Sequence, residues 1–343
     1  MLARILGIGI LLFAVIIPGA CTRKEEPVII ATREPEQITF DSAVSGGSIV
    51  YGEESGITDR GMVWDTRVDP ALGSNSGKIS VKTADNDFEV VIGELEPETT
   101  YYLRAFAVNK WGTFYGDERS FKTFYGEVTD ADGNKYYTVK IGDREWMGSN
   151  LATARYSNGD IIPNISTNQG WRSTSEGAWS GYNNNPGLHH VYGKLYNWHA
   201  VVDPRGLCPA GWHVPSDIEW IKLEIELGMI PSSAASSGLR DRYAGGKLKE
   251  AGTKHWLTPN VLATDEIGFS ALPGGYRHPH GQFYTLRRNL NCWTSTGHSE
   301  IDAWFRNIYF NNAGISRNVY NKNSGFSVRC IRGLPVEYHE SSK

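Results

Sequence analysis

Hydrophobic and polar positions alternate along residues 28–124, in short runs separated by Gly, Asn, Asp and Pro. Such alternation is typical of strands that bury one face. Residues 61–64, 88–92 and 101–108 are the clearest of these predicted strands. The pattern therefore predicts an all-β antiparallel sandwich that ends at residue 124.

The pattern changes in residues 126–335, which open with a predicted hairpin. Asp130, Asp132 and Asn134 have the spacing of calcium ligands, but an EF-hand loop needs Gly at its sixth position and Glu at its twelfth. Lys135 and Ile141 occupy those two places. We therefore interpret residues 132–134 as a turn between strands.

Two helices are predicted in the middle of this second segment. Tyr192–Val202 places apolar residues on one stripe. Ser216–Leu227 begins with Ser-Asp-Ile-Glu, a capping box in which two side chains satisfy each other's backbone N–H groups. Its predicted buried stripe consists of Ile218, Ile221 and Ile225, and Gly228 ends it.

Strand patterns close the segment. Residues 303–310 and 315–320 flank a Gly-containing turn and predict a second hairpin, and residues 325–332 predict the last strand. The chain is thus predicted to be multidomain, with an N-terminal all-β sandwich over 28–124 and a C-terminal α+β domain over 126–335.

Composition excludes some functions. The 343 residues carry a net charge of −4, with scattered lysines and arginines, which argues against nucleic-acid binding. Nine of the eleven tryptophans fall within 126–335. This concentration makes the second domain the place to expect recognition chemistry.

The first 20 residues have the pattern of a signal peptide, with Arg4 followed by an apolar run and small residues before Cys21. A Cys in this place predicts lipid modification, although Pro18 stands where a lipobox usually has Leu. The alternative is an ordinary secretory cleavage. Residues 21–27 are the expected tether and 336–343 a C-terminal tail. We expect a lipoprotein of the outer membrane of a Gram-negative bacterium, facing outward.

The first domain resembles fibronectin type III domains. Leu95, Pro97 and Thr99 ahead of Tyr101 form the tyrosine-corner pattern, in which the hydroxyl bonds back to upstream backbone. The resemblance continues from Gly112 to residue 121. No loop concentrates titratable or aromatic groups, so we expect a spacer rather than a binding domain.

The second domain resembles the Fibrobacter succinogenes major paralogous domain over residues 126–332. The motifs that carry this resemblance are residues 130–134 (DADGN), 138–142 (TVKIG), 195–198 (LYNW), 211–217 (GWHVPSD), 245–249 (GGKLK), 272–277 (LPGGYR) and 325–330 (GFSVRC). Such domains occur in secreted or surface proteins. The resemblance implies a family but not a ligand.

A more distant resemblance is to formylglycine-generating enzymes, which have the C-type lectin-like fold. It rests on residues 214–220 and 325–329. The resemblance implies a disulfide between Cys208 and Cys330. A bond between Cys292 and Cys330 is the alternative; otherwise Cys292 is expected to be a buried, inert thiol.

The sequence contains no hydrolase or phosphate-binding motif, and no pair of neighbouring thiols for oxidase chemistry. His189, His190, His199, His278 and His280 raise the possibility of a zinc site. Histidines in loops without a metal are the preferred interpretation. We therefore expect no enzyme activity and no cofactor.

Carbohydrate binding agrees best with the residue types, because Trp and Tyr faces stack on sugar rings and Asn amides bond hydroxyls. The candidate ligand-binding residues are Trp171, Trp179, Tyr182, Asn183, Asn184, Asn311 and Asn312. The calcium-dependent signatures of true C-type lectins are missing. We expect an extracellular adhesion module for glycans; the alternative is a structural component that binds a surface protein.

The lipid anchor gives the first prediction. Replacing Cys21 with Ser removes the thiol that would carry the lipid, so the variant is expected in the soluble fraction, where the unmodified chain stays with membranes. Fractionation of cells followed by immunoblotting checks this. A variant that still sediments with membranes would rule out the anchor.

Overall fold

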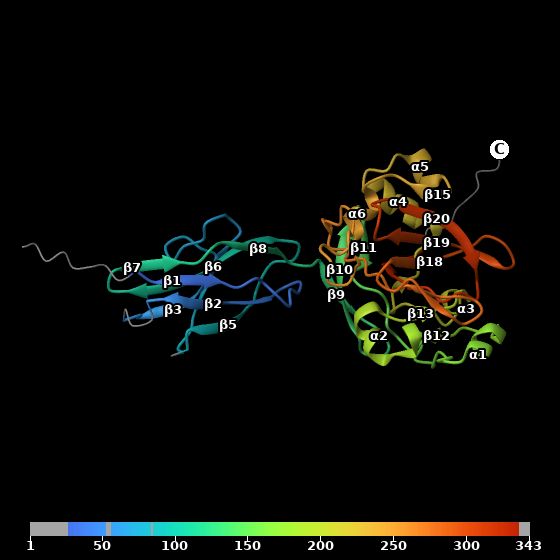
Figure 1. Ribbon diagram of the computed structural model, residues 1–343, viewed down its shortest axis with the longest axis horizontal. Coiled ribbons are helices and arrows are strands. Elements are labelled where there is room, and N and C mark those ends of the chain that lie inside the picture. Colours follow the sequence, from blue (N-terminus) through green and yellow to red (C-terminus); the bar gives the residue numbers. More distant parts are fainter. Residues whose placement is uncertain (1–26, 53–55, 84, 336–343) are drawn as a thin grey trace, which may run out of the picture.

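The computed structural model describes residues 27–52, 56–83 and 85–335. The predicted signal peptide, Cys21, nearly all of the predicted tether and the predicted tail lie outside these residues. Figure 1 shows two separate bodies joined near residue 125. Within the described part of the chain, no helix has the length and apolarity needed to cross a bilayer.

The N-terminal body consists of two antiparallel sheets. One has the order β1-β2-β5, and the other has β4-β3-β6-β7, with β8 also pairing with β6. Its strands are β1 Ile29–Thr32, β2 Ala43–Tyr51, β3 Asp59–Asp65, β4 Gly77–Ser80, β5 Asp87–Ile92, β6 Thr100–Asn109, β7 Gly112–Tyr115 and β8 Arg119–Lys122. The Tyr101 hydroxyl accepts a hydrogen bond from the Glu96 backbone N–H at 3.0 Å, as the tyrosine-corner pattern predicts.

The C-terminal body combines short helices with several small sheets. Its helices are α1 Asn168–Ser173, η1 Tyr182–Asn184, α2 Pro186–Tyr192, α3 Trp198–Val201, α4 Asp217–Glu226, α5 Pro231–Ala235 and α6 Ala244–Leu248. Its strands are β9 Gly126–Thr129, β10 Lys135–Ile141, β11 Arg144–Met147, β12 Trp179–Ser180, β13 Leu195–Tyr196, β14 Trp212–His213, β15 Gly238–Arg240, β16 Tyr276–Arg277, β17 Phe283–Tyr284, β18 Asn289–Gly297, β19 Asp302–Tyr309, β20 Ile315–Asn321 and β21 Ile331–Arg332.

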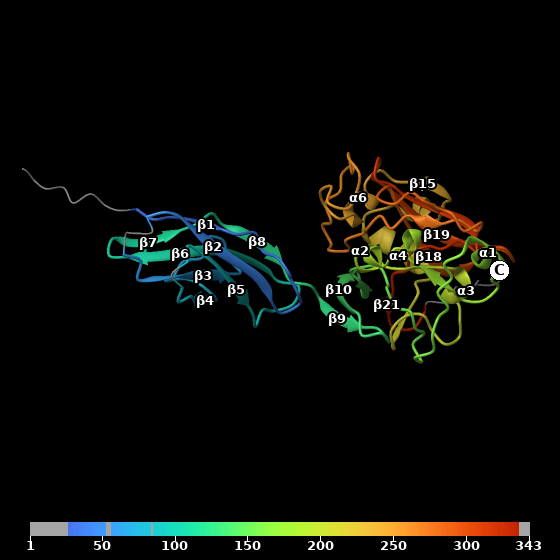
Figure 2. The same ribbon diagram turned by 60° about the horizontal axis from the view of Figure 1, so that its bottom comes forward.

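Two sheets organise this second body. One has the order β14-β21-β11-β10-β9 and the other β15-β20-β19-β18. The predicted hairpins are confirmed, because β9 pairs with β10 and β19 with β20. In Figures 1 and 2, α4 and α6 lie close to the β15–β18 sheet, and α1–α3 gather around the β12–β13 pair.

The junction between the bodies is short and packed against the second one. The backbone N–H of Tyr125 donates to the Thr138 carbonyl at 2.9 Å. The ring of Phe124 stacks on Tyr137, with centroids 4.9 Å apart and planes 8° from parallel. Residues 124 and 125 therefore contact the first strands of the second body.

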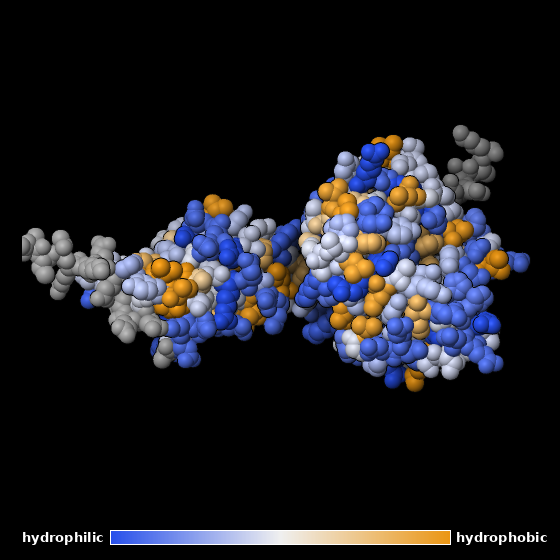
Figure 3. All heavy atoms as spheres, viewed as in Figure 1, coloured by the Kyte–Doolittle hydropathy of each residue, from blue (hydrophilic) through white to orange (hydrophobic). Residues whose placement is uncertain are grey.

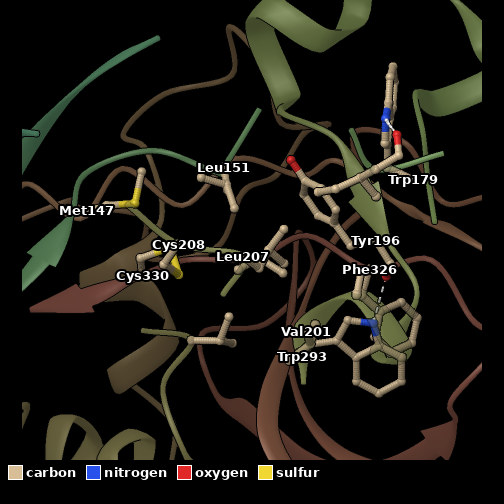
Figure 4. Close-up of a cluster of buried hydrophobic side chains, with 14 of the residues drawn as sticks. Met147, Leu151, Trp179, Tyr196, Val201, Leu207, Cys208, Trp293, Phe326 and Cys330 are labelled. Carbon is tan, nitrogen blue, oxygen red and sulfur yellow. Dashed lines mark hydrogen bonds between the residues drawn. A yellow bond between two sulfur atoms is a disulfide. The ribbon is translucent and has the colours of Figure 1, made fainter. Parts of the chain in front are cut away.

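Buried tryptophans and a disulfide hold the core of the second body together (Figure 4). Cys208 and Cys330 form the disulfide that the family resemblance implies, with Cα atoms 5.9 Å apart. Trp293 lies nearby and donates its indole N–H to the Tyr196 carbonyl. Cys292 is buried and unpaired.

The predicted helix over Tyr192–Val202 is wrong. Helix α2 ends at Tyr192, and Gly193 takes the left-handed conformation with φ of 74°. A Cβ on Gly193 would lie 2.8 Å from the Leu151 carbonyl oxygen, so the chain turns sharply here. Residues 195–196 then form β13, and the short helix α3 starts at Trp198 after an Asn197 cap. The apolar stripe was real, but a glycine in its first turn divides it.

Helix α4 forms where predicted, including the capping box. The Ser216 hydroxyl accepts from the Glu219 N–H at 3.3 Å, and the Glu219 carboxylate accepts from the Ser216 N–H at 2.9 Å. The predicted buried stripe is wrong, however. Ile218, Ile221 and Ile225 are only half-buried, whereas the residues fully buried are Asp217, Glu219, Trp220, Leu223 and Glu224.

Two of these buried carboxylates face inward because arginines on the sheet meet them. Glu224 accepts from Arg240 of β15 at 2.6 and 2.8 Å, and from Arg306 of β19 at 2.6 Å. Arg306 also donates to Asp217 at 2.6 Å, and Arg317 of β20 donates to the same carboxylate. A network of three cations and two anions therefore fixes α4 to three strands.

The predicted last strand is only partly correct. Of residues 325–332, only Ile331 and Arg332 belong to a sheet, as β21. Phe326 and Ser327 make single bridges, to Tyr196 and Cys292 respectively. This segment crosses between small sheets, so it has no single partner strand.

The buried network gives a stability prediction. Replacing Glu224 with Ala leaves Arg240 and Arg306 buried with one carboxylate fewer, and such losses cost about 3–5 kcal/mol of the free energy of unfolding. Replacing Glu226, an exposed carboxylate on the same helix, is expected to cost less than about 0.5 kcal/mol. Urea denaturation of both variants measures the difference, and equal costs would contradict the role given to the network.

The thiols give a third prediction. Burial raises the pKa of Cys292 to about 12, so its thiolate is scarce at neutral pH. Iodoacetamide should leave Cys292 unmodified in the native chain and modify it in urea without a reductant. Cys208 and Cys330 should react only after reduction. Peptide mapping distinguishes these states, and a disulfide that includes Cys292 would refute the assignment.

Candidate functional site

The β16–β17 hairpin carries aromatic side chains on one face. Tyr276 pairs with Tyr284 across the hairpin, with ring centroids 5.6 Å apart. Tyr320 of β20 is edge-on to Tyr276 at 6.1 Å, and His278 is 6.4 Å from Tyr320. Tyr284 is 45% exposed, and the other three are half-buried. Tyr182 is included with these residues in what is called the aromatic face, although it packs on Phe283, which points to the other side of the hairpin.

The ring of Tyr182 packs close to the backbone of the hairpin at Gly275. Burial, with Tyr320, Tyr284 and Tyr182 nearby, raises the pKa of Tyr276 to about 12. Gly275 has a φ of 65°, and a Cβ there would lie 2.8 Å from the Tyr182 ring and 2.5 Å from the Tyr284 carbonyl oxygen. Only glycine allows this close approach.

A buried arginine supports the face from below. The guanidinium of Arg277 lies between the rings of Trp171 and Phe283, 4.4 and 4.8 Å from their centroids. It donates to the carbonyls of Gly281 at 2.9 Å and of Ser166 and Thr167 at 3.1 Å each, and also to Ile165. Phe283 in turn packs on Tyr182 at 5.3 Å. This stack fixes the hairpin to the loop before α1.

Exposed amides border the face. Asn183 and Asn184 both have left-handed φ angles, of 51° and 54°, which Asn tolerates better than most residues. The Asn184 amide donates to the Ser166 carbonyl at 3.0 Å, beside the carbonyls that Arg277 binds. Three predicted ligand-binding residues, Tyr182, Asn183 and Asn184, therefore do lie together.

The two predicted tryptophans lie in the core instead. Trp171 is fully buried, and its indole N–H donates to the Asn323 carbonyl at 2.8 Å. Trp179 is 9% exposed and donates to the Ile162 carbonyl (Figure 4). Neither indole presents a face to a ligand, contrary to the expectation, because each satisfies the backbone of a neighbouring loop.

Asn311 and Asn312 are not part of this surface. They lie in the β19–β20 turn, where the Asn312 carbonyl accepts from the buried Lys249 ammonium at 3.0 Å. Tyr320 is at the other end of β20, about 20 Å away along an extended strand. These two asparagines therefore do not complete one site with Tyr182.

The histidines do not converge on one point. His278 Nδ1 accepts from the His280 backbone N–H at 3.2 Å, and burial together with His280 lowers the pKa of His278. His199 bonds the Asn323 side chain instead. Among the residues described, no three His, Cys, Asp or Glu side chains lie close enough to hold a metal ion.

Two open clefts exist elsewhere. One, of about 430 Å³, is bordered by Ile161, His199 and Asp203, and hydrogen bonds from Arg205 lower the pKa of Asp203 to about 2. The other, of about 260 Å³, is bordered by Trp146 and by Glu219, which bonds His213 and Arg144. Asp203 and Glu219, the acids of the two clefts with a lowered pKa, are each paired with a basic side chain.

The hairpin of the aromatic face was missed from the sequence. A signal was present, since Tyr276 and His278 alternate with Arg277, and Pro-His-Gly separates them from Phe283 and Tyr284. The contribution of Tyr320 could not be found this way, because it comes from a strand 36 residues after Tyr284.

Comparisons with solved structures find β-sandwich proteins. The sensor domain of the anti-sigma factor RsgI4 of Pseudobacteroides cellulosolvens is 25% identical, covers 28% of this chain and 94% of its own, and has a TM-score of 0.22. A redesigned β-sandwich protein is 20% identical, with coverages of 26% and 87% and a TM-score of 0.21. Domains A168–A170 of titin are 17% identical, with coverages of 29% and 33% and a TM-score of 0.21.

No curated protein is similar enough to count as a relative. The family comparison is more informative, because residues 139–332, more than half of the chain, match the Fibrobacter succinogenes major domain. This match covers the disulfide and all of the residues of the aromatic face. The chain therefore belongs to the Fibrobacter succinogenes major domain family.

Proposed function

We propose that this protein is a non-catalytic, lipid-anchored surface protein whose second domain binds glycans through the aromatic face. The observation that carries the proposal is the cluster of Tyr182, Tyr276, Tyr284 and Tyr320 at a partly exposed surface. Sugar rings present C–H faces that stack on such rings, while tyrosine hydroxyls exchange hydrogen bonds with sugar hydroxyls.

Rigidity of the site supports binding. Arg277 ties the hairpin to residues 165–167 and stacks between two aromatic rings, so the face is held in place before a ligand arrives. A preformed surface loses less conformational entropy on binding than loops that must be ordered. Neighbouring amides of Asn183 and Asn184 supply both donors and acceptors at its border.

The states of Cys292, Asp203 and Glu219 favour a non-catalytic role. The Cys292 thiol is buried with a raised pKa, which disfavours a nucleophilic thiolate. In the two clefts, the Asp203 carboxylate bonds Arg205, and the Glu219 carboxylate bonds His213 and Arg144. A general acid needs a raised pKa, which is the opposite of the shift at Asp203.

The proposal also includes finer fold assignments. A fibronectin type III-like first domain is supported by the tyrosine corner at Tyr101 and by two packed antiparallel sheets. A C-type lectin-like second domain is supported by the Cys208–Cys330 disulfide, helix α4 and the closing segment. In this arrangement the first domain is a stalk, and the lipid at Cys21 anchors it to the outer membrane.

A protein partner is the second candidate, favoured by a different surface. Ile29, Val50 and Tyr51 are each more than half exposed where β1 and β2 pair in the first domain. In the view of Figure 3, however, apolar residues form small separate patches among hydrophilic ones. Protein-binding surfaces are usually larger and more continuous.

The aromatic face gives the fourth prediction. Replacing Tyr284 with Ala removes a stacking ring without touching the core, and affinity for a bound polysaccharide should fall about tenfold, which corresponds to about 1.4 kcal/mol. Affinity electrophoresis of the full chain against plant, host and microbial polysaccharides, with and without EDTA, measures it. Binding is expected to survive EDTA.

The matched control is Tyr243→Ala, because Tyr243 is 60% exposed and lies at the start of α6, outside the face. This variant should bind as the unmodified chain does. Equal losses in both variants would remove the aromatic face from the proposal. Failure of the unmodified chain to bind any polysaccharide would refute glycan binding and direct attention to a protein partner.

A further inference from the structure

We infer that the aromatic face selects acidic glycans, whose sugars carry carboxylate or sulfate groups. This inference rests on the proposed glycan-binding function and narrows its ligand class. It follows from the charges and hydrogen-bond donors of the segments that build the face.

Acidic residues are scarce in the segments that form and border the face. Residues 165–173, 181–194, 267–299 and 303–324 contain no Asp or Glu, and the turn that joins the last two of these segments contains Glu300 and Asp302. Exposed basic residues in the same segments are Arg172, His190, His280, Arg287, Arg288 and His298, of which His280 contacts the face, with its ring 4.9 Å from that of His278. Because the whole chain has a net charge of −4, the acids are concentrated elsewhere. The local potential therefore favours an anion.

The nearest acid along the sheet faces the other way. Asp302 of β19 pairs with Asn321, whereas Tyr320 pairs with Ala303. Since successive side chains of a strand point to opposite faces, Asp302 lies on the side opposite Tyr320. The carboxylate of Asp302 therefore does not neutralise the positive charges on the side of the sheet where Tyr320 lies.

The donors of the face suit an acceptor-only ligand. His278 Nδ1 accepts the His280 backbone N–H, so the proton of the neutral imidazole is on Nε2. Tyrosine hydroxyls also donate, and carboxylates or sulfates accept without donating. A neutral sugar hydroxyl can use the tyrosine hydroxyls as acceptors, whereas a carboxylate or sulfate uses only the donors and also gains from the positive charges nearby.

His278 couples this selectivity to pH. The groups that face it are His280, Tyr284 and Tyr320, with ring centroids at 4.9, 6.1 and 6.4 Å, and none is acidic. A bound anion supplies the missing negative charge and raises the pKa of His278 in the complex. Affinity for an acidic glycan should therefore increase as the pH falls from 7.5 to about 5.5.

The test uses pairs of polymers that differ only in charge. Calorimetry of the full chain compares polygalacturonate with its fully methyl-esterified form, and dextran sulfate with dextran. We expect at least about tenfold tighter binding to the charged member of one pair, weakened by added salt. The first pair tests carboxylate and the second tests sulfate. Tyr284→Ala should reduce this binding too, which non-specific attraction would not show.

A histidine variant isolates the pH effect. His278→Gln keeps an N–H donor but cannot gain a charge, so binding at pH 7.5 should persist while the increase toward pH 5.5 becomes smaller, because His280 remains. His298→Gln is the control, since His298 packs on Trp304 rather than on the face. An unchanged pH profile in His278→Gln would overturn the role of His278.

The outcomes separate this inference from the proposed function. Equal affinity for charged and uncharged members of both pairs would overturn selectivity for acidic glycans while leaving glycan binding in place. Binding to neutral polysaccharides alone would do the same. Absence of binding to every polymer, charged or neutral, would overturn both.

Discussion

Irregular backbone inside a folded domain leaves carbonyl groups without the hydrogen-bond partners that helices and sheets provide, and this constraint shapes the whole second domain. Three fully buried cations supply the missing hydrogen-bond donors. Arg277, Arg329 and Lys249 each donate to at least three backbone carbonyls from loops distant in sequence. Buried tryptophan N–H groups do the same for single carbonyls. The cations therefore replace the regular hydrogen bonds that longer helices and strands would provide.

The ionic network under α4 solves a different problem with similar residues. Here Glu224 and Asp217 neutralise two of the three positive charges of Arg240, Arg306 and Arg317. The guanidinium of Arg317 also lies 3.7 Å from the centre of the Trp304 ring. Desolvation makes such a network costly to form, but it fixes one orientation of the helix. A purely apolar stripe on α4 would leave its rotation less constrained.

Local signals in the sequence predicted local structure well. The Ser216 capping box, the 132–134 turn and the β19–β20 hairpin each depend on a few adjacent residues. The wrong predictions concern side chains whose burial depends on partners distant in the sequence. Inward-facing Glu224 requires arginines up to 82 residues away, and Trp171 is buried because Arg277, 106 residues later, stacks on it. Periodicity alone cannot reveal partners at such separations, so the candidate site was only partly found.

The same separation explains why the aromatic face combines residues that the sequence keeps apart. Tyr182, the 276–284 hairpin and Tyr320 belong to three segments. Phe283 of the Trp171–Arg277–Phe283 stack contacts Tyr182, and two backbone hydrogen bonds between Arg277 and Gly325 join the hairpin to the segment that follows β20. Arg277 keeps its positive charge at neutral pH, since burial lowers its pKa only to about 10. Because it binds carbonyls rather than carboxylates, that charge stays uncompensated beneath the face. The residue that stabilises the loops thus also contributes to the positive potential at the surface above it.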